Sequence, residues 1–246
     1  MENYEKETIA AIATALSDSG IGIVRISGEN AIYIVDSIFR SASGKKILTK
    51  VQSHMIHYGY IVDKDENIID EVMTSVMKAP KSYTMEDTVE INCHGGVLVM
   101  QKVLETVLQA GARLAEPGEF TKRAFLNGRI DLSRAEAVID VIHSQNEYAL
   151  SSSVSQLKGR LSDKIRSLRE DILYQIAFIE SALDDPEHIS LEGYPEQLAE
   201  KVTGFEKEIQ KLLATADNGR LMKEGISTVI VGKPNAGKSS LLNMLL

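Results

Sequence analysis

One short segment near the end of the printed sequence restricts the fold more than any other. The segment GKPNAGKS fits the pattern G-x-x-x-x-G-K-[ST] at Gly232, Gly237, Lys238 and Ser239. A loop of this kind surrounds phosphate oxygens with backbone N–H groups, and it must follow a strand and open a helix. Both flanks agree, because STVIV is a short β-branched run and SSLLNMLL is apolar and rich in helix formers. The sequence therefore predicts the start of an α/β nucleotide-binding domain over residues 220–246.

A phosphate loop alone does not hydrolyse a nucleotide. Hydrolysis also needs an acidic segment that orients Mg²⁺ and a group that positions water, and guanine selection needs a base-reading segment. In folds of this type these parts follow the loop, whereas here only residues 240–246 follow Ser239. We therefore expect the chain to be the front part of a longer protein, without GTPase activity of its own. We also expect no ordered sheet around Val229 to Val231.

Composition excludes several classes of protein. A net charge of −8 argues against a broad nucleic-acid-binding surface, although a local basic patch stays possible. Cys93 is the only cysteine, so an internal disulfide is impossible. The sequence has no apolar run of membrane-spanning length and no basic-then-apolar signal at its start. These observations predict a cytoplasmic protein without membrane contact.

The first 120 residues alternate short strands with a few helices. Period-two patterns predict strands at residues 8–14, 21–27, 54–62, 68–77 and 87–92, and helical spacing predicts helices at 29–39 and 97–110. Gly111 follows the second of these helices as a C-cap. This pattern favours an α+β N-terminal domain over residues 1–120.

Residues 121–219 show helical periodicity and no strand signal, which predicts an all-α helical domain. The first helix of this domain is predicted in LSRAEAVIDVIHS, where Ser133 and Glu136 are spaced as a capping box. From Leu157 to Leu183 apolar residues step by threes and fours, which predicts a single helix of about 27 residues, ended by DDPE. A third helix, with apolar positions from 198 to 212, is predicted to stop at DNG, residues 217–219.

Two charged residues lie inside predicted strands that are otherwise apolar. Arg25 occurs in GIGIVRISG and Glu90 in TVEIN. Because a buried unpaired charge is costly, each must find a partner or line a cavity. One interpretation is a structural ion pair, and the other is a ligand pocket in which the carboxylate accepts hydrogen bonds from an amino-pyrimidinone edge. His94 lacks a neighbouring acid or nucleophile and is interpreted as a turn residue, whereas Gly95 and Gly96 are expected to permit close backbone approach.

Four segments together resemble a known family. IAAIATALSDSGIGIVRISG, HGG, PGEFTKRAFLNGRIDLSRAEAVIDVI and GKPNAGKSSLLN occur in this order. With them the chain resembles the MnmE (TrmE) family of bacterial and organellar tRNA-modification GTPases. The resemblance implies an N-terminal tetrahydrofolate-binding and dimerisation domain, a helical domain, and a Ras-like GTPase domain inserted into the latter.

The resemblance also implies an activity and its partners. With an FAD- and NADH-using partner, MnmG (GidA), the family installs an aminomethyl or carboxymethylaminomethyl group on carbon 5 of the wobble uridine of certain tRNAs. The one-carbon donor is 5-formyl- or 5,10-methylene-tetrahydrofolate. GTP hydrolysis depends on K⁺ and uses Mg²⁺, and the family forms homodimers.

Matched position by position, the resemblance assigns site residues. Arg25, Glu90 and Arg129 fall on folate-contacting positions. Phosphate binding falls on the loop and helix start, Asn235, Ala236, Gly237, Lys238, Ser239 and Ser240. Within this set, Asn235 is matched to a K⁺ ligand and Ser239 to a Mg²⁺ ligand. No catalytic residue is assigned within the 246 residues.

Two other functions stay open from the sequence. By its phosphate loop alone, the chain fits equally well another RNA-associated P-loop GTPase with an unrelated front domain. Alternatively, its front domain acts as a non-enzymatic folate-binding dimer module. Folate binding by residues 1–120 separates the first alternative from the family assignment, and a turnover assay separates the second.

Overall fold

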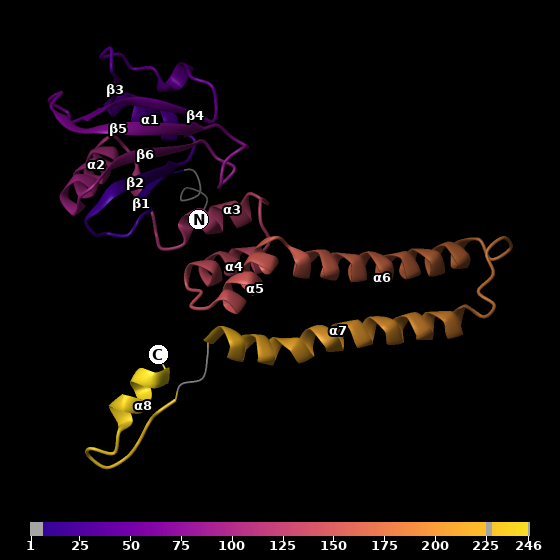
Figure 1. Cartoon of the computed structure of the whole chain (residues 1–246). Coiled ribbons are helices and arrows are strands. Elements are labelled where there is room, and N and C mark those ends of the chain that lie inside the picture. The colour runs from indigo at the N-terminus through magenta and orange to yellow at the C-terminus, as the bar shows by residue number, and fades with distance from the viewer. Residues whose placement is uncertain (1–6, 225–227, 246) are drawn as a thin grey trace. The chain divides into compact units, whose positions relative to one another are not determined.

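The structure is a computed structural model that describes residues 7–224 and 228–245. The chain divides into two compact units, Met1–Ala135 and Glu136–Leu246. Figure 1 shows the sheet-containing unit in indigo and magenta and the helical unit in orange and yellow.

The first unit contains one mixed, seven-stranded sheet. Its strands are β1 (Ile9–Ile12), β2 (Ser19–Ser27), β3 (Phe39–Ser41), β4 (Met55–Val62), β5 (Ile68–Met77), β6 (Thr88–Gly95) and β7 (Arg113–Leu114). Their order across the sheet is β3-β4-β5-β6-β2-β1-β7. All pairs are antiparallel except β1 with β7. The central pair, β2 with β6, joins segments that are far apart in the sequence.

Two helices, α1 (Ala31–Ile38) and α2 (Val97–Gln109), supply apolar side chains to the core of this unit. Strand residues at alternate positions, such as Val24 and Ile26, are fully buried in the same cluster. Because strand side chains alternate between faces, Arg25 lies on the face opposite to this core. A short 3₁₀ turn (Leu48–Lys50) and the helix α3 (Glu119–Leu126) complete the unit.

The second unit consists of helices. They are α5 (Glu147–Leu157), α6 (Arg160–Asp184), α7 (Tyr194–Glu224) and α8 (Lys238–Leu245), and α4 (Leu132–Ile142) spans the boundary between the units. Helices α6 and α7 run antiparallel, as Figure 1 shows. Lys164 of α6 pairs with Glu208 of α7 at 2.8 Å, and Tyr194 of α7 contacts Gln175 of α6. The predicted α+β fold followed by a helical domain is confirmed.

Several predicted elements are wrong in detail. The helix expected from Leu157 to Leu183 is present as α6 and ends at Asp184 as predicted. It begins at Arg160 rather than Leu157, because Gly159 adopts a left-handed φ of 88° and Leu157 is the last residue of α5. Asparagine, aspartate and glycine cost at most about 1 kcal/mol each in a helix interior. The third helix, expected to stop at DNG, residues 217–219, therefore continues through it, and α7 ends at Glu224.

The start of α4 also differs from the prediction. The helix begins at Leu132, before the proposed capping serine, and the Asp131 carboxylate accepts a hydrogen bond from the backbone N–H of Arg134 at 2.9 Å. Asp131 is therefore the N-cap in place of Ser133. Helices α3 and α5 and the short strands β3 and β7 are not among the predicted elements.

The segment STVIV is not a strand in the described residues 228–231. Val229 and Val231 are 80% and 85% exposed, and no residue of α8 is buried. Since a strand needs a neighbouring strand for its hydrogen bonds, the β-branched composition alone does not create one. The expectation of no ordered sheet around these valines agrees with the structure.

Candidate functional sites

Arg25 and Glu90 lie directly opposite each other on β2 and β6. The Arg25 Nε and Nη2 atoms both approach Oε1 of Glu90 at 2.7 Å. Their side chains are 30% and 22% exposed, so the pair borders solvent rather than lying in the core. The structural ion pair is thus formed. Among the described residues no group bonds the second carboxylate oxygen, Oε2, which leaves Glu90 able to accept a further hydrogen bond.

Two aromatic rings border this pair. The guanidinium carbon of Arg25 lies 5.7 Å from the ring centres of Tyr83 and of Phe120. The guanidinium carbon of Arg129 lies 4.9 Å from the centre of the same Tyr83 ring. Tyr83 therefore connects all three predicted folate-contacting residues into one cluster.

Hydrogen bonds hold the Tyr83 turn against α3. The Tyr83 hydroxyl lies 2.9 Å from the hydroxyl of Thr121, on the first turn of α3. At the other end of the helix, the Asn127 side-chain amide donates to the Thr84 carbonyl at 2.7 Å. Helix α3 therefore positions Phe120, Tyr83 and the following Arg129 together. Tyr83 and Phe120 are not among the site residues predicted from the sequence. Their only signal there is that each is an aromatic residue in a turn-rich segment.

An ionic network fixes α3 to the sheet. Arg123 is 6% exposed and donates to Glu86 at 3.1 Å and to Glu119 at 3.1 Å. Arg113 of β7 donates to the same Glu119 at 2.7 Å. Burial alone would raise the pKa of Glu119, but hydrogen bonds from Arg113, the Glu116 N–H and Arg123 outweigh it and lower this pKa to about 2. The arginine and glutamate charges of this network are paired with one another, which indicates a structural role.

An open cavity of about 580 Å³ lies beside Tyr83. Its lining comes from the residue before β4, from the end of β5, from the turn that carries this tyrosine, and from the chain that follows α3: His54, Met77, Pro80, Lys81, Ser82, Tyr83, Met85 and Arg129. No carboxylate belongs to this lining. Lys81 and Arg129 give the cavity a positive charge.

His94 belongs to β6 and is not a turn residue as predicted. Asp70 accepts hydrogen bonds from its backbone N–H at 2.8 Å and contacts its Nδ1 at 2.7 Å, and this contact raises the pKa of His94. The close approach expected at Gly95 is confirmed, because a Cβ there would lie 2.4 Å from the Ser19 carbonyl oxygen. At Gly96 the nearest atom would be 3.8 Å away, so that expectation is wrong.

The predicted phosphate loop turns sharply into α8. Asn235 and Gly237 adopt left-handed φ values of 60° and 76°, and α8 begins at Lys238. The Lys238 ammonium donates to the carbonyls of Gly232 and Lys233 at 2.9 and 2.8 Å. These bonds fold the lysine back over its own loop. Ala236 and Ser240 are exposed, as are Asn235, Gly237 and Ser239.

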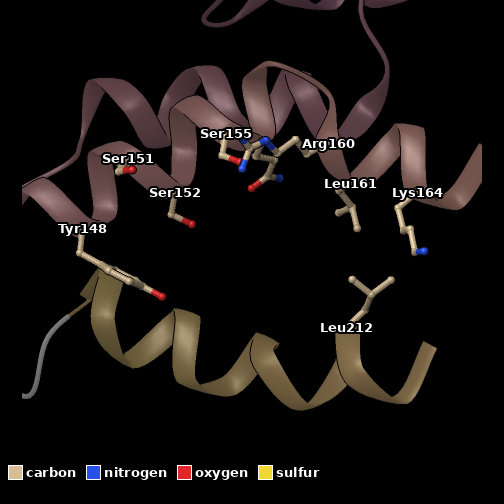
Figure 2. A pocket seen from close by; sticks show the side chains of 9 residues that line it. Tyr148, Ser151, Ser152, Ser155, Arg160, Leu161, Lys164 and Leu212 are labelled. Carbon is tan, nitrogen blue, oxygen red and sulfur yellow. The ribbon is translucent and has the colours of Figure 1, made fainter. Parts of the chain in front are cut away.

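The helical unit contains a separate polar groove of about 660 Å³. Figure 2 shows it between α5, α6 and α7, with Leu161 and Leu212 pointing toward one another at one end. Its lining includes the hydroxyl groups of Ser151, Ser152 and Ser155. None of the predicted site residues lies here, and the charge of Lys164 is already paired with Glu208.

Two kinds of feature are absent from the part of the chain that the structure describes. No helix in residues 7–224 and 228–245 has the length and hydropathy required to cross a membrane. Within the same residues no three histidine, cysteine, aspartate or glutamate side chains gather where they could hold a metal ion.

Comparison with known proteins identifies the family. The family model described as "GTP-binding protein TrmE N-terminus" matches residues 8–129, and the one described as "MnmE helical domain" matches residues 132–241. The chain belongs to the MnmE (TrmE) family. The two matches follow one another along almost the whole sequence, as the resemblance predicted.

Individual MnmE relatives agree with this assignment. The chain is 62% identical over 239 residues to the tRNA modification GTPase MnmE of Lachnoclostridium phytofermentans. It is 52% identical over 241 residues to that of Bacillus subtilis, and 54% identical over 243 residues to that of Geobacillus kaustophilus. These alignments cover 97–98% of the chain but 52% of each relative, so the chain spans about half the length of the MnmE proteins it matches.

Proposed function

We propose that the protein acts in GTP-dependent modification of tRNA and that its first unit binds the folate that donates the one-carbon group. The reaction is the addition of an aminomethyl or carboxymethylaminomethyl group at carbon 5 of a wobble uridine. The FAD- and NADH-dependent partner is MnmG (GidA). Support comes from the family, because the relatives described above are named tRNA modification GTPases.

The cluster around Tyr83 carries the folate part of the proposal. A reduced folate has an amino-pyrimidinone ring, an aminobenzoyl ring and a carboxylate tail. Glu90 offers Oε2 to the ring N–H groups, Tyr83 and Phe120 offer aromatic faces, and the arginines offer positive charge. The residues present therefore fit both ends of such a ligand. Arg25, Glu90 and Arg129 are accordingly the proposed folate-contacting residues.

The phosphate loop carries the nucleotide part. The loop residues Asn235 to Ser240 and the Lys238 ammonium fit the phosphates of GTP, although the Ala236 N–H donates to the Lys233 carbonyl at 3.3 Å in this structure. Ser239 would hold Mg²⁺ and Asn235 would hold K⁺. These ions would neutralise phosphate charge when bound, whereas the chain's own groups bind and orient the nucleotide.

The homodimer and the domain limits belong to the same proposal. We assign dimerisation and folate binding to residues 1–120, with Arg129 of the following segment completing the folate site. We assign the helical domain to residues 121–219 and the start of the GTPase domain to residues 220–246. In support of dimerisation, Ile56, Tyr58 and Met73 are 45–64% exposed on neighbouring strands of the sheet. Exposed apolar side chains that lie together are typical of interaction surfaces.

Replacement of Glu90 tests the folate site. Charge-assisted hydrogen bonds contribute about 1.5–3 kcal/mol each, so Glu90→Ala should weaken 5-formyl-tetrahydrofolate binding roughly ten- to a hundredfold. Glu105→Ala, on the exposed surface of α2, is the matched control and should bind like the original protein. Calorimetric titration measures both. Equal affinities for the three proteins would remove Glu90 from the site, and no folate binding at all would favour another RNA-associated GTPase.

A further inference from the structure

The cavity beside Tyr83 has an unusual charge balance for a protein with a net charge of −8. Lys81 and Arg129 both line it, and no aspartate or glutamate does. Within the described part of the chain, neither cation has a carboxylate at ion-pair distance. Two unpaired cations beside one open cavity favour an anionic ligand there.

Tyr83 lies between this cavity and the Arg25–Glu90 pair. Its ring contacts Arg25 on one element and Arg129 on another, and it also lines the cavity. The Thr121 hydroxyl fixes the phenol at 2.9 Å, so the ring has a defined place between the two regions. A ligand that crosses this ring meets Glu90 at one end and Lys81 with Arg129 at the other.

We propose that the cavity is a subsite for the carboxylate tail of the folate, and that the protein prefers folates carrying several glutamates over those carrying one. This inference rests on the proposed function of the same cluster. It adds Lys81 as a tail-binding residue and Tyr83 as the ring that separates the two ends of the ligand.

The polarity of the cluster sets the direction of the ligand. The amino-pyrimidinone end donates hydrogen bonds and therefore suits the free oxygen of Glu90. Each glutamate added to the tail brings one further negative charge, which suits the cationic cavity. Because the cavity is open, each added ion pair contributes little alone, and the preference grows with the number of carboxylates.

Calorimetry on the complete 246-residue chain tests the inference, with the mono- and triglutamate forms of 5-formyl-tetrahydrofolate as probes. The triglutamate should bind about fivefold tighter at low salt, and the advantage should shrink as salt is added. Lys81→Gln should reduce the advantage to about twofold, because it removes one of the two cations that face the added carboxylates. Lys81→Arg should restore the advantage because it restores the charge.

Lys64→Gln is the matched control, since it removes one exposed lysine from the β4–β5 hairpin of the same unit. It should leave the preference intact. Equal affinity of the original protein for both probes would overturn the inference alone, as would an equal effect of Lys81→Gln and Lys64→Gln on the preference. Failure to bind either probe would overturn the inference together with the proposed folate site.

Discussion

Burial sets the chemistry of Cys93. The side chain is 3% exposed, and burial, aided by the charge of Asp70, raises its pKa to about 11. Since the thiolate is the reactive form, we predict that a thiol reagent at pH 8 labels the folded protein on the order of a hundredfold more slowly than the unfolded protein. Absorbance of the released thiol product, with and without denaturant, measures both rates. Equal rates would contradict the burial of this thiol.

Glu119 should make stability depend on acid. Its folded pKa is lowered from 4.5 to about 2, so its contribution is fully present above the unfolded value and is lost as the pH falls through about 2. The contribution is up to about 3 kcal/mol at neutral pH. Glu119→Gln should therefore be less stable at pH 7 and should have a flatter stability profile between pH 4.5 and 2.

Urea unfolding at a series of pH values measures that profile. Glu116→Gln, at an exposed position nearby, is the control and should follow the original protein. A profile of Glu119→Gln as steep as that of the original protein would show that other carboxylates dominate.

Residue patterns predict part of the candidate site. Arg25 and Glu90 are visible in the sequence because a charge interrupts an apolar strand, and their direct pairing follows once β2 and β6 are neighbours. Tyr83 is not predictable in the same way, because its turn has no periodicity and its partner Thr121 comes from α3. Contacts of this kind are set by tertiary packing.

At the scale of elements, Gly159 lies between α5 and α6, whereas the predicted apolar spacing runs across it from Leu157. Its φ of 88° is left-handed, and alanine is disfavoured there by roughly 1–2 kcal/mol. We predict that Gly159→Ala lowers stability by about 1 kcal/mol. Gly204, inside α7, has open space around its Cα and no left-handed φ, so Gly204→Ala should raise stability by about 0.5–1 kcal/mol.

Thermal unfolding of the two alanine variants checks this pair. The opposite signs are the expected result. A stabilising effect of Gly159→Ala would show that the left-handed φ is not required there and that a helix can run on from Leu157, as the spacing alone predicts.

Apolar periodicity predicts the existence of elements better than their ends. Strands β4 to β6 and helices α1 and α2 follow from it, because one face of each packs on the core. The break at Gly159 and the cap at Asp131 depend on single backbone angles and hydrogen bonds, which periodicity does not contain. The absence of a strand at residues 228–231 shows that β-branched composition without a pairing partner is insufficient.

At the scale of the whole molecule, the proposed dimer gives a direct prediction. Sedimentation at micromolar concentration should show a particle of twice the 27.0 kDa chain mass. Ile56→Lys should shift it toward the monomer, because Ile56 lies 64% exposed among apolar residues of the sheet. Leu98→Lys on α2, at a position 69% exposed, is the matched control. A dimer that survives Ile56→Lys places the interface elsewhere, and a monomeric original protein removes the dimer.

The pairing of β2 with β6 also has a kinetic consequence. Arg25 and Glu90 are adjacent in space but 65 positions apart in the chain, so they meet only when a loop that contains α1 and strands β3 to β5 has closed. Closing such a long loop costs chain entropy before the contacts that reward it are made, and non-local pairing of this kind slows folding. During synthesis, the Arg25–Glu90 pair cannot form until β6 has left the ribosome. The appearance of folate affinity in a refolding experiment would then mark the late closure of the sheet.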